Sequence, residues 1–137
     1  MKKRLFLDAN IMLDLLGDRE PYYEAIAKIA TLAEKDKLTL VVSPISLATV
    51  NYFLTKFENE KIAKEKLRKF EVICEISSIN KMTVEKSLQS DFKDFEDALQ
   101  YYCALDSDCA IIITRNAKEF KKSALPIMSA HEFLKSL

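Results

Sequence analysis

The most constraining feature of the sequence is an apolar run at residues 110–114, which reads AIIIT. A strand made of apolar residues throughout is typical of a parallel sheet that is covered on both faces. Elsewhere, short apolar segments alternate with longer segments in which apolar residues recur at helical spacing, such as Tyr22, Ile26, Ile29 and Ala33. This alternation predicts an α/β domain in which helices cover a parallel sheet.

The length of 137 residues suits one domain, and the chain contains one glycine, three prolines, no internal repeat and no low-complexity linker. We therefore expect a single domain over residues 1–137. Strands are expected at 4–8, 39–42, 72–77 and 110–114, with a weak fifth strand at 125–128 that Pro126 disfavours. Helices are expected at 10–16, from Pro21 to about 33, at 44–57, 60–70, 81–90 and 95–105, and at the C-terminus after a capping box formed by Ser129 and Glu132.

The charge balance limits how such a chain can bind nucleic acid. Lysine and arginine together number 21, aspartate and glutamate also number 21, and the sequence pI is about 6.6. An RNA site would therefore be a local patch rather than a property of the whole surface. The chain lacks the run of about 18 apolar residues that marks a membrane span, and the apolar run before Asp8 is too short for a signal peptide. We expect a cytoplasmic protein with no membrane contact.

The cysteines and the histidine exclude several catalytic classes. Cys74, Cys103 and Cys109 are odd in number and show no short metal-binding or redox spacing, so we expect reduced, buried side chains. The single histidine, His131, is expected on the surface in the first turn of the terminal helix. A serine or cysteine triad and a histidine–cysteine zinc site are both disfavoured.

Polar residues follow the predicted strands at their carboxyl ends. Asp8 ends the first strand, Ser43 follows the second, and Thr114, Arg115 and Asn116 follow the fourth. Ligands of open parallel sheets bind at this edge, where the strand order reverses. If the first and fourth strands are neighbours, Asp8 and Asn116 face one crevice.

More acids lie in the segment SDFKDFEDALQYYCA. Asp94 has the position of a helix N-cap, and Glu96 and Asp97 lie in the first turn of the helix that follows. Acids in a first helical turn are also favoured by capping and by the helix dipole alone, without any function, and Asp8 could likewise be only an N-cap. If these acids converge, their mutual repulsion calls for a cation, and Mg²⁺ or Mn²⁺ suits carboxylate and water ligands. Such an ion can activate a water for attack on phosphorus.

Three segments together resemble the PIN-domain superfamily: FLDAN with Leu13 and Asp14 following, DFEDALQYYCA, and IIITRNAKEF. The resemblance covers essentially the whole chain and is greatest to the compact PIN domains that serve as toxins in bacterial toxin–antitoxin pairs. It implies a three-layer α/β/α fold with a central parallel sheet of four to five strands. It also implies a ribonuclease that uses Mg²⁺ or Mn²⁺, a cognate antitoxin that covers the acidic crevice, and a homodimer.

The resemblance assigns roles to single positions. Asp8 matches the first metal-binding aspartate, Asp97 matches the third acid with Glu96 as an extra acid beside it, and Asn116 stands at the fourth acidic position. Thr114 is expected to orient a water or a phosphate. The positions expected to support the site are Asn10, Ser43, Thr114 and Arg115.

The second acid of the family pattern is missing. The family places a glutamate about two turns into the helix after the second strand, but here that helix reads SPISLATVNYFL and contains no acid. Thr49, or its neighbour Asn51, stands at the expected position. The alternative to a nuclease is therefore a degenerate PIN-like module that binds RNA or a protein partner without cleavage.

Basic residues near the fourth strand are candidates for phosphate contact. They are Arg115, Lys118, Lys121 and Lys122, and a solvated helix face explains them equally well.

Two other families in which an acidic residue follows the first strand fit the sequence less well. A haloacid-dehalogenase-type enzyme would need an aspartate where Asn10 stands, and a receiver domain would need paired acids after the first strand.

Overall fold

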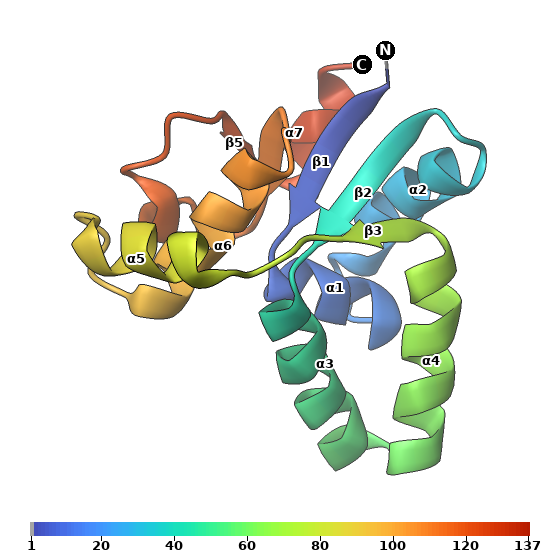
Figure 1. Ribbon diagram of the computed structural model, residues 1–137. Helices are drawn as coiled ribbons and strands as arrows, with labels where there is room; N and C mark the ends of the chain where they lie inside the picture. The colour runs from blue at the N-terminus through green and yellow to red at the C-terminus, as the bar shows by residue number, and fades with distance from the viewer. Residues whose placement is uncertain (1) are drawn as a thin grey trace.

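The computed structural model describes residues 2–137 and contains a five-stranded parallel sheet flanked by helices (Figure 1). The strands lie in the order β3-β2-β1-β4-β5, and each neighbouring pair is parallel. Their bounds are β1 Lys3–Leu7, β2 Leu38–Val42, β3 Cys74–Ile76, β4 Ile111–Ile113 and β5 Ile127–Met128. The predicted α/β class and number of strands are confirmed.

The chain reverses direction across the sheet at β1. From β1 it moves outward to β2 and β3, and then returns to the other side of β1 to form β4 and β5. Phe6 of β1 is therefore paired with Val41 on one side and with Ile112 on the other. The first and fourth strands are therefore neighbours, which was the condition for Asp8 and Asn116 to lie near one another, and the residues after both strands come to one edge.

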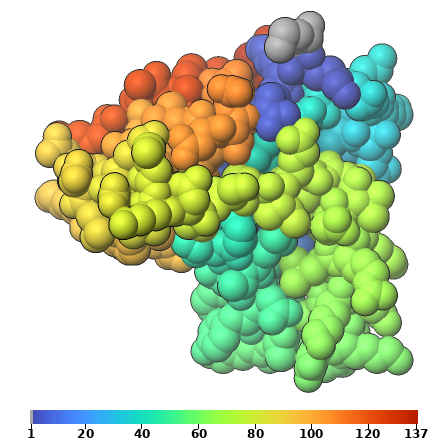
Figure 2. All heavy atoms as spheres, in the orientation of Figure 1, coloured from blue at the N-terminus to red at the C-terminus, as the bar shows by residue number. Residues whose placement is uncertain are grey.

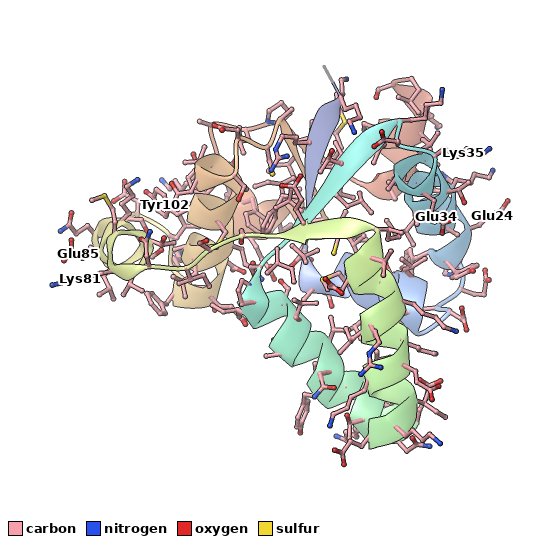
Figure 3. All side chains as sticks on the ribbon, turned by 45° about the vertical axis from the view of Figure 1, so that its right-hand side comes forward. Glu24, Glu34, Lys35, Lys81, Glu85 and Tyr102 are labelled. Atoms are coloured by element: carbon pink, nitrogen blue, oxygen red, sulfur yellow. The ribbon has the colours of Figure 1, made fainter. Side chains whose placement is uncertain are left out.

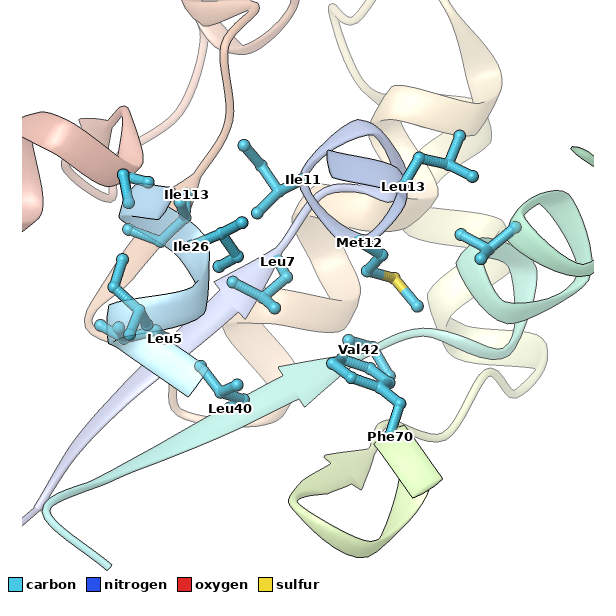
Figure 4. Packing of buried hydrophobic residues seen from close by; sticks show 14 of the residues in the cluster. Leu5, Leu7, Ile11, Met12, Leu13, Ile26, Leu40, Val42, Phe70 and Ile113 are labelled. Carbon is cyan, nitrogen blue, oxygen red and sulfur yellow. The ribbon is translucent and has the colours of Figure 1, made fainter. Parts of the chain in front are cut away.

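Two hydrophobic clusters, one on each face, explain the layers. The alternation of β1 sends Leu5 and Leu7 into the larger cluster and Phe6 into the smaller one. The larger cluster packs against the helices α1 (Ala9–Leu16), α2 (Tyr23–Glu34), α3 (Pro44–Phe57), α4 (Glu60–Val72) and α7 (Ala130–Lys135), as Figure 4 shows in part. The smaller cluster packs against α6 (Phe95–Asp106) and the short 3₁₀ helix η1 (Ala117–Phe120).

The helices α3 and α4 form a hairpin that projects downward from the body of the domain in Figure 1, whereas α5 (Lys81–Gln89) and α6 lie to the left of the sheet. Figure 2 shows a concave outline between these two parts of the surface. The carboxyl ends of β1 and β2 point toward this region. Charged residues of α2 and α5, including Glu24, Glu34 and Lys81, point outward (Figure 3).

Several predicted boundaries move by one or more residues. The first strand ends at Leu7 rather than at 8, because Asp8 already caps α1. The third strand was predicted at 72–77 and is limited to Cys74–Ile76, because α4 continues through Val72. The fifth strand has only two residues, consistent with Pro126 directly before it.

The expected helix start at Pro21 is wrong, because α2 begins at Tyr23, but two other helix starts are confirmed. Ser43 caps α3 with Pro44 in its first turn, and Ser129 and Glu132 form the predicted capping box of α7. The three cysteines are free, with Cys103 and Cys109 buried and Cys74 half-buried. Within residues 2–137, no helix has both the length and the apolarity needed to cross a membrane.

Candidate active site

Asp8 occupies the turn between β1 and α1, and both of its carboxylate oxygens accept hydrogen bonds. Oδ1 accepts from the backbone N–H of Ala9 at 2.8 Å, and Oδ2 accepts from the hydroxyl of Thr114 at 2.8 Å. The residue is only 7% exposed. Burial is the main reason that the pKa of Asp8 is raised, and the two hydrogen bonds oppose this effect. Asp8 is thus the N-cap of α1 and also a buried carboxylate that is hydrogen-bonded to Thr114, the residue directly after the neighbouring strand β4.

The Thr114 hydroxyl is oriented by a second contact. The backbone N–H of Asn116 donates to Oγ1 of Thr114 at 3.0 Å. Because the oxygen already accepts this bond, its own hydrogen is free to point to Asp8. The contact between the ends of the first and fourth strands is therefore made by Thr114, while the exposed side chain of Asn116 contacts Glu119.

The first turn of α6 supplies the second group of acids. Asp94 caps the helix by accepting from the backbone N–H of Asp97 at 3.0 Å, as its position predicted. The pKa of Asp97 is raised to about 7, first by burial and then by the negative charges of Glu119, Asp94 and Asp8. These influences join residues from the ends of β1, α6 and η1 in one electrostatic cluster.

Glu119 is a further acid of this edge, and no sequence pattern singled it out. It lies on η1, and the side-chain amide of Asn116 donates to its Oε1 at 3.2 Å. Its pKa is raised by burial and by the charge of Asp8, with smaller effects of Asp94 and Glu96, while hydrogen bonding with Asp97 opposes the rise. An acid one helical turn after a strand end was the available signal, because such a turn folds back over the carboxyl edge.

Glu96, Ser43 and Asn10 lie in different surroundings. The exposed Glu96 has the smallest of the electrostatic influences on Glu119. The hydroxyl of Ser43 is buried and donates to Oε1 of Gln100 at 2.6 Å, which ties the start of α3 to α6. Asn10 contributes its backbone carbonyl, which accepts from Arg19 at 3.2 Å.

The helix α3 brings no acid to this edge. Thr49 and Asn51 are both half-buried, so each is partly covered by neighbouring residues. The buried polar groups at its start are neutral: the amide of Gln100 donates to Oγ of Ser46 at 2.5 Å. Among residues 2–137, no group of three His, Cys, Asp or Glu side chains stands in position to hold a metal ion.

Arg115 makes its closest contacts away from the acids of α6 and η1. Its Nε and Nη2 donate to the two carboxylate oxygens of Asp14 at 2.9 and 3.1 Å. The guanidinium carbon also lies 3.8 Å from the centre of the Tyr22 ring. The other predicted phosphate contacts, Lys118, Lys121 and Lys122, are exposed.

Comparison with known proteins places the chain in a family. The sequence pattern of the PIN domain family matches residues 4–118. The chain is 28% identical to Ribonuclease VapC1 of Aquifex aeolicus over 136 residues, which covers 96% of this chain and 93% of the relative.

Solved structures agree with this placement at the level of the fold. VapBC2 from Rickettsia felis, bound to a DNA fragment from the promoter, has a TM-score of 0.69 and 21% identity over 92% of this chain and 97% of that chain. A toxin–antitoxin complex from Klebsiella pneumoniae has a TM-score of 0.68 and 22% identity over 93% and 98%. The Mycobacterium tuberculosis toxin VapC20, which cleaves the sarcin–ricin loop, has a TM-score of 0.62 and 11% identity over 79% and 86%.

The family pattern covers most of the chain, including Asp8, Asp97 and Thr114. The chain therefore belongs to the PIN domain family.

Proposed function

We propose that the protein is a metal-dependent endoribonuclease that hydrolyses phosphodiester bonds of RNA. The observation that supports this most directly is the cluster of Asp8, Asp97 and Glu119, in which each carboxyl has a raised pKa. Clustered acids with perturbed pKa values at the carboxyl edge of a parallel sheet are typical of an active site. The similarity to a ribonuclease supports RNA as the substrate.

The donor chemistry of the cluster fits Mg²⁺ or Mn²⁺. All three side chains offer hard carboxylate oxygens, and the nearby cation Arg115 is paired with Asp14. We propose that Asp8, Asp97 and Glu119 hold the ion, after side-chain rotation that brings their oxygens together. When bound, such an ion binds a phosphate oxygen and lowers the pKa of a water that attacks phosphorus.

The protein's own residues prepare this chemistry. Thr114 and the N–H of Ala9 hold the Asp8 carboxylate in one orientation. The positive end of α6 lies beside Asp97, since that residue is in the first helical turn. The pKa of Asp97, raised to about 7, leaves this carboxyl partly protonated near neutral pH, and a bound cation would favour its deprotonated form.

We further propose that the nuclease is the toxin of a toxin–antitoxin pair and acts in the cytoplasm. The support is its similarity to Ribonuclease VapC1, together with a fold shared with the toxin VapC20 and with a toxin–antitoxin complex from Klebsiella pneumoniae. The expected partners are RNA and a cognate antitoxin that covers the acidic edge. A homodimer is also expected. Exposed apolar residues on the projecting hairpin, Tyr52 and Phe57, would suit such contacts.

One observation favours the second candidate, a PIN-like module that binds RNA or protein without cleavage. The helix α3 carries Thr49 where the family pattern has a glutamate, so the cluster has one carboxylate fewer. Fewer carboxylates weaken the binding of a hard divalent cation.

The deciding experiment is cleavage of a mixed RNA pool with Mn²⁺, with Mg²⁺, and with chelator. We expect cleavage that requires a divalent metal and is lost in Asp8→Asn. Glu34→Gln, on the outer face of α2, is a matched control that removes one carboxylate far from the cluster (Figure 3). RNA binding without any metal-dependent cleavage would favour the non-catalytic module instead.

A further inference from the structure

The buried carboxylate of Asp14 lies between two arginines on the α1 side of the candidate active site. Arg115 binds it with Nε and Nη2, and Arg19 binds Oδ1 with Nε at 3.0 Å and Nη2 at 2.9 Å. Asp14 is 1% exposed, whereas the side chains of Arg19 and Arg115 remain 39% and 32% exposed. Two guanidinium groups on one carboxylate leave this triad with a net positive charge.

From this geometry we propose that Arg19 and Arg115 form a binding site for a phosphate of the RNA strand, next to the phosphate that is cut. The proposal rests on the proposed function and names a contact that holds the substrate. A phosphate is the chemistry that fits, because guanidinium groups bind it through several parallel N–H donors.

The first argument is the supply of donors. A guanidinium group has five N–H groups, and the contacts to Asp14 and to the carbonyl of Asn10 use only Nε and Nη2 of each arginine. The two N–H groups on each Nη1 are left out of this pairing. Since both side chains are partly exposed, these donors can reach a ligand from solvent.

The second argument is rigidity. Arg115 is held at two points by Asp14 and lies 3.8 Å from the centre of the Tyr22 ring, while Arg19 is held by Asp14 and by Asn10. Side chains that are already fixed lose little conformational entropy when they bind. Exposed lysines such as Lys118 and Lys122 lack this advantage, because their flexible side chains must be immobilised.

The third argument is position. Arg115 directly follows Thr114, whose hydroxyl lies 2.8 Å from Asp8, and Arg19 contacts the carbonyl of Asn10, two residues after Asp8. The site therefore flanks Asp8 on the side of α1, while Asp97 and Glu119 come from α6 and η1. A cluster of carboxylates repels a polyanion, and fixed positive charge beside it offsets this repulsion.

The surface beside Arg115 has room for a nucleoside. A hollow of about 230 Å³ is lined by Asp14, Tyr22 and Arg115, by apolar residues of α1, α2 and α7, and by the polar Ser129 and His131. Tyr22 is 43% exposed, so part of its ring faces solvent. A nucleotide whose phosphate meets the arginines can place its base over this apolar surface.

The test measures binding of a short single-stranded RNA, without divalent metal so that no cleavage occurs, across a range of salt concentrations. The variants are Arg19→Gln and Arg115→Gln. The control is Lys35→Gln, an exposed lysine at the end of α2 where the chain enters β2, on the opposite edge of the sheet (Figure 3). Each lost phosphate contact should reduce the slope of log Kd against log salt by about 0.7, and Lys35→Gln should leave the slope unchanged.

A second measurement locates the contact. Neutral methylphosphonate linkages are placed one at a time along the RNA, and one linkage should weaken binding to the wild-type protein by about tenfold, as expected for a charge-assisted contact. The same linkage should weaken binding to Arg19→Gln by clearly less than tenfold, because the variant has already lost the Arg19 part of the contact and only Arg115 remains to be affected. Should Arg115→Gln fail to fold by circular dichroism, Arg19→Gln decides the test, since it leaves Asp14 with its two-point partner.

Slopes and linkage effects equal to wild type in the folded variants would overturn this site. If the wild-type protein still cuts RNA with Mn²⁺, the proposed function survives that result. A wild-type protein that neither binds nor cuts RNA overturns both proposals.

Discussion

The hydroxyl of Thr114 donates a 2.8 Å hydrogen bond to Oδ2 of Asp8, which joins two residues 106 positions apart in the sequence. The bond exists because β1 and β4 are parallel neighbours that end at the same edge of the sheet. It fixes the carboxylate around which the proposed active site is arranged.

Replacing Thr114 tests this relationship. Thr114→Val keeps the shape but removes the hydroxyl, so Asp8 loses a donor and the N–H of Asn116 loses an acceptor. We expect a loss of about 1–3 kcal/mol of unfolding free energy and weaker Mn²⁺ binding, measured by urea denaturation and calorimetry. Thr114→Ser retains the hydroxyl and should behave like wild type. Equal Mn²⁺ affinity in all three proteins would contradict an orienting role.

The raised pKa of Asp97 predicts how stability depends on pH. The pKa rises from 3.8 to about 7 on folding, so between these values the folded state binds more protons than the unfolded state. Without divalent metal, the stabilising contribution of the Asp97 carboxyl to the unfolding free energy should therefore be fully present below pH 4. This contribution should be lost as the pH rises toward about 7. The raised pKa values of Asp8 and Glu119 act in the same direction.

Thermal melts in chelator from pH 4 to pH 8 measure this dependence, apart from the contributions of other groups. Asp97→Asn should flatten the decline, and Glu34→Gln, an exposed acid on α2, should not. Mn²⁺ should stabilise the wild-type protein most at high pH, because the ion binds the deprotonated carboxyls. A melting temperature in Asp97→Asn that falls as steeply as in wild type would contradict the shift.

Substitutions of Glu119 and Asn116 test which of the two residues contributes more to RNA cleavage. Glu119 is a carboxylate of the acidic cluster, whereas Asn116 is a neutral side chain that donates a hydrogen bond to it. We expect Glu119→Gln to lower metal-dependent RNA cleavage by at least about tenfold, or about 1.4 kcal/mol of barrier. Asn116→Ala should have a smaller effect. If Asn116→Ala lowers the cleavage rate more than Glu119→Gln does, then Asn116 and not Glu119 serves at the fourth acidic position of the family pattern.

Restoring the missing acid on α3 tests the second family position. Residues 49 and 51 point about 200° apart on a helix, so at most one of them can face the acidic edge. We expect Thr49→Glu to tighten Mn²⁺ binding and to raise the cleavage rate, and Asn51→Glu to do neither. Isothermal titration with Mn²⁺ distinguishes the two. If neither variant changes affinity or rate, α3 does not contribute to the metal site.

The Asp14 triad predicts a large effect on stability. Asp14→Asn removes a buried charge that two arginines share, and breaking a buried ion pair costs about 3–5 kcal/mol. Because both arginines are partly exposed, we expect a loss at the low end of this range. The control is Glu75→Gln, which breaks the exposed two-point pair with Arg4 and should cost at most about 1 kcal/mol. If urea denaturation shows a similar loss of unfolding free energy in both variants, the burial of Asp14 does not increase the contribution of its ion pairs to stability.

Much of the fold could be predicted from the sequence because its signals are local. The period of apolar residues distinguished strands from helices, and short polar motifs such as Ser43–Pro44 and Ser129 with Glu132 marked helix starts. These features depend on residues within one or two turns of each other. Boundaries moved where neighbouring elements competed, as at Val72, which extends α4 at the expense of β3.

The site was predictable only in part, and for a related reason. Asp8 and Asp97 could be placed by their positions at a strand end and in a first helical turn, which the chain itself determines. Tertiary structure decided that Glu119 rather than the Asn116 side chain meets Asp97, and that Arg115 turns to Asp14. Such choices depend on the directions of side chains from segments far apart in sequence, and burial then sets their charge and pKa. A local pattern carries no information about either.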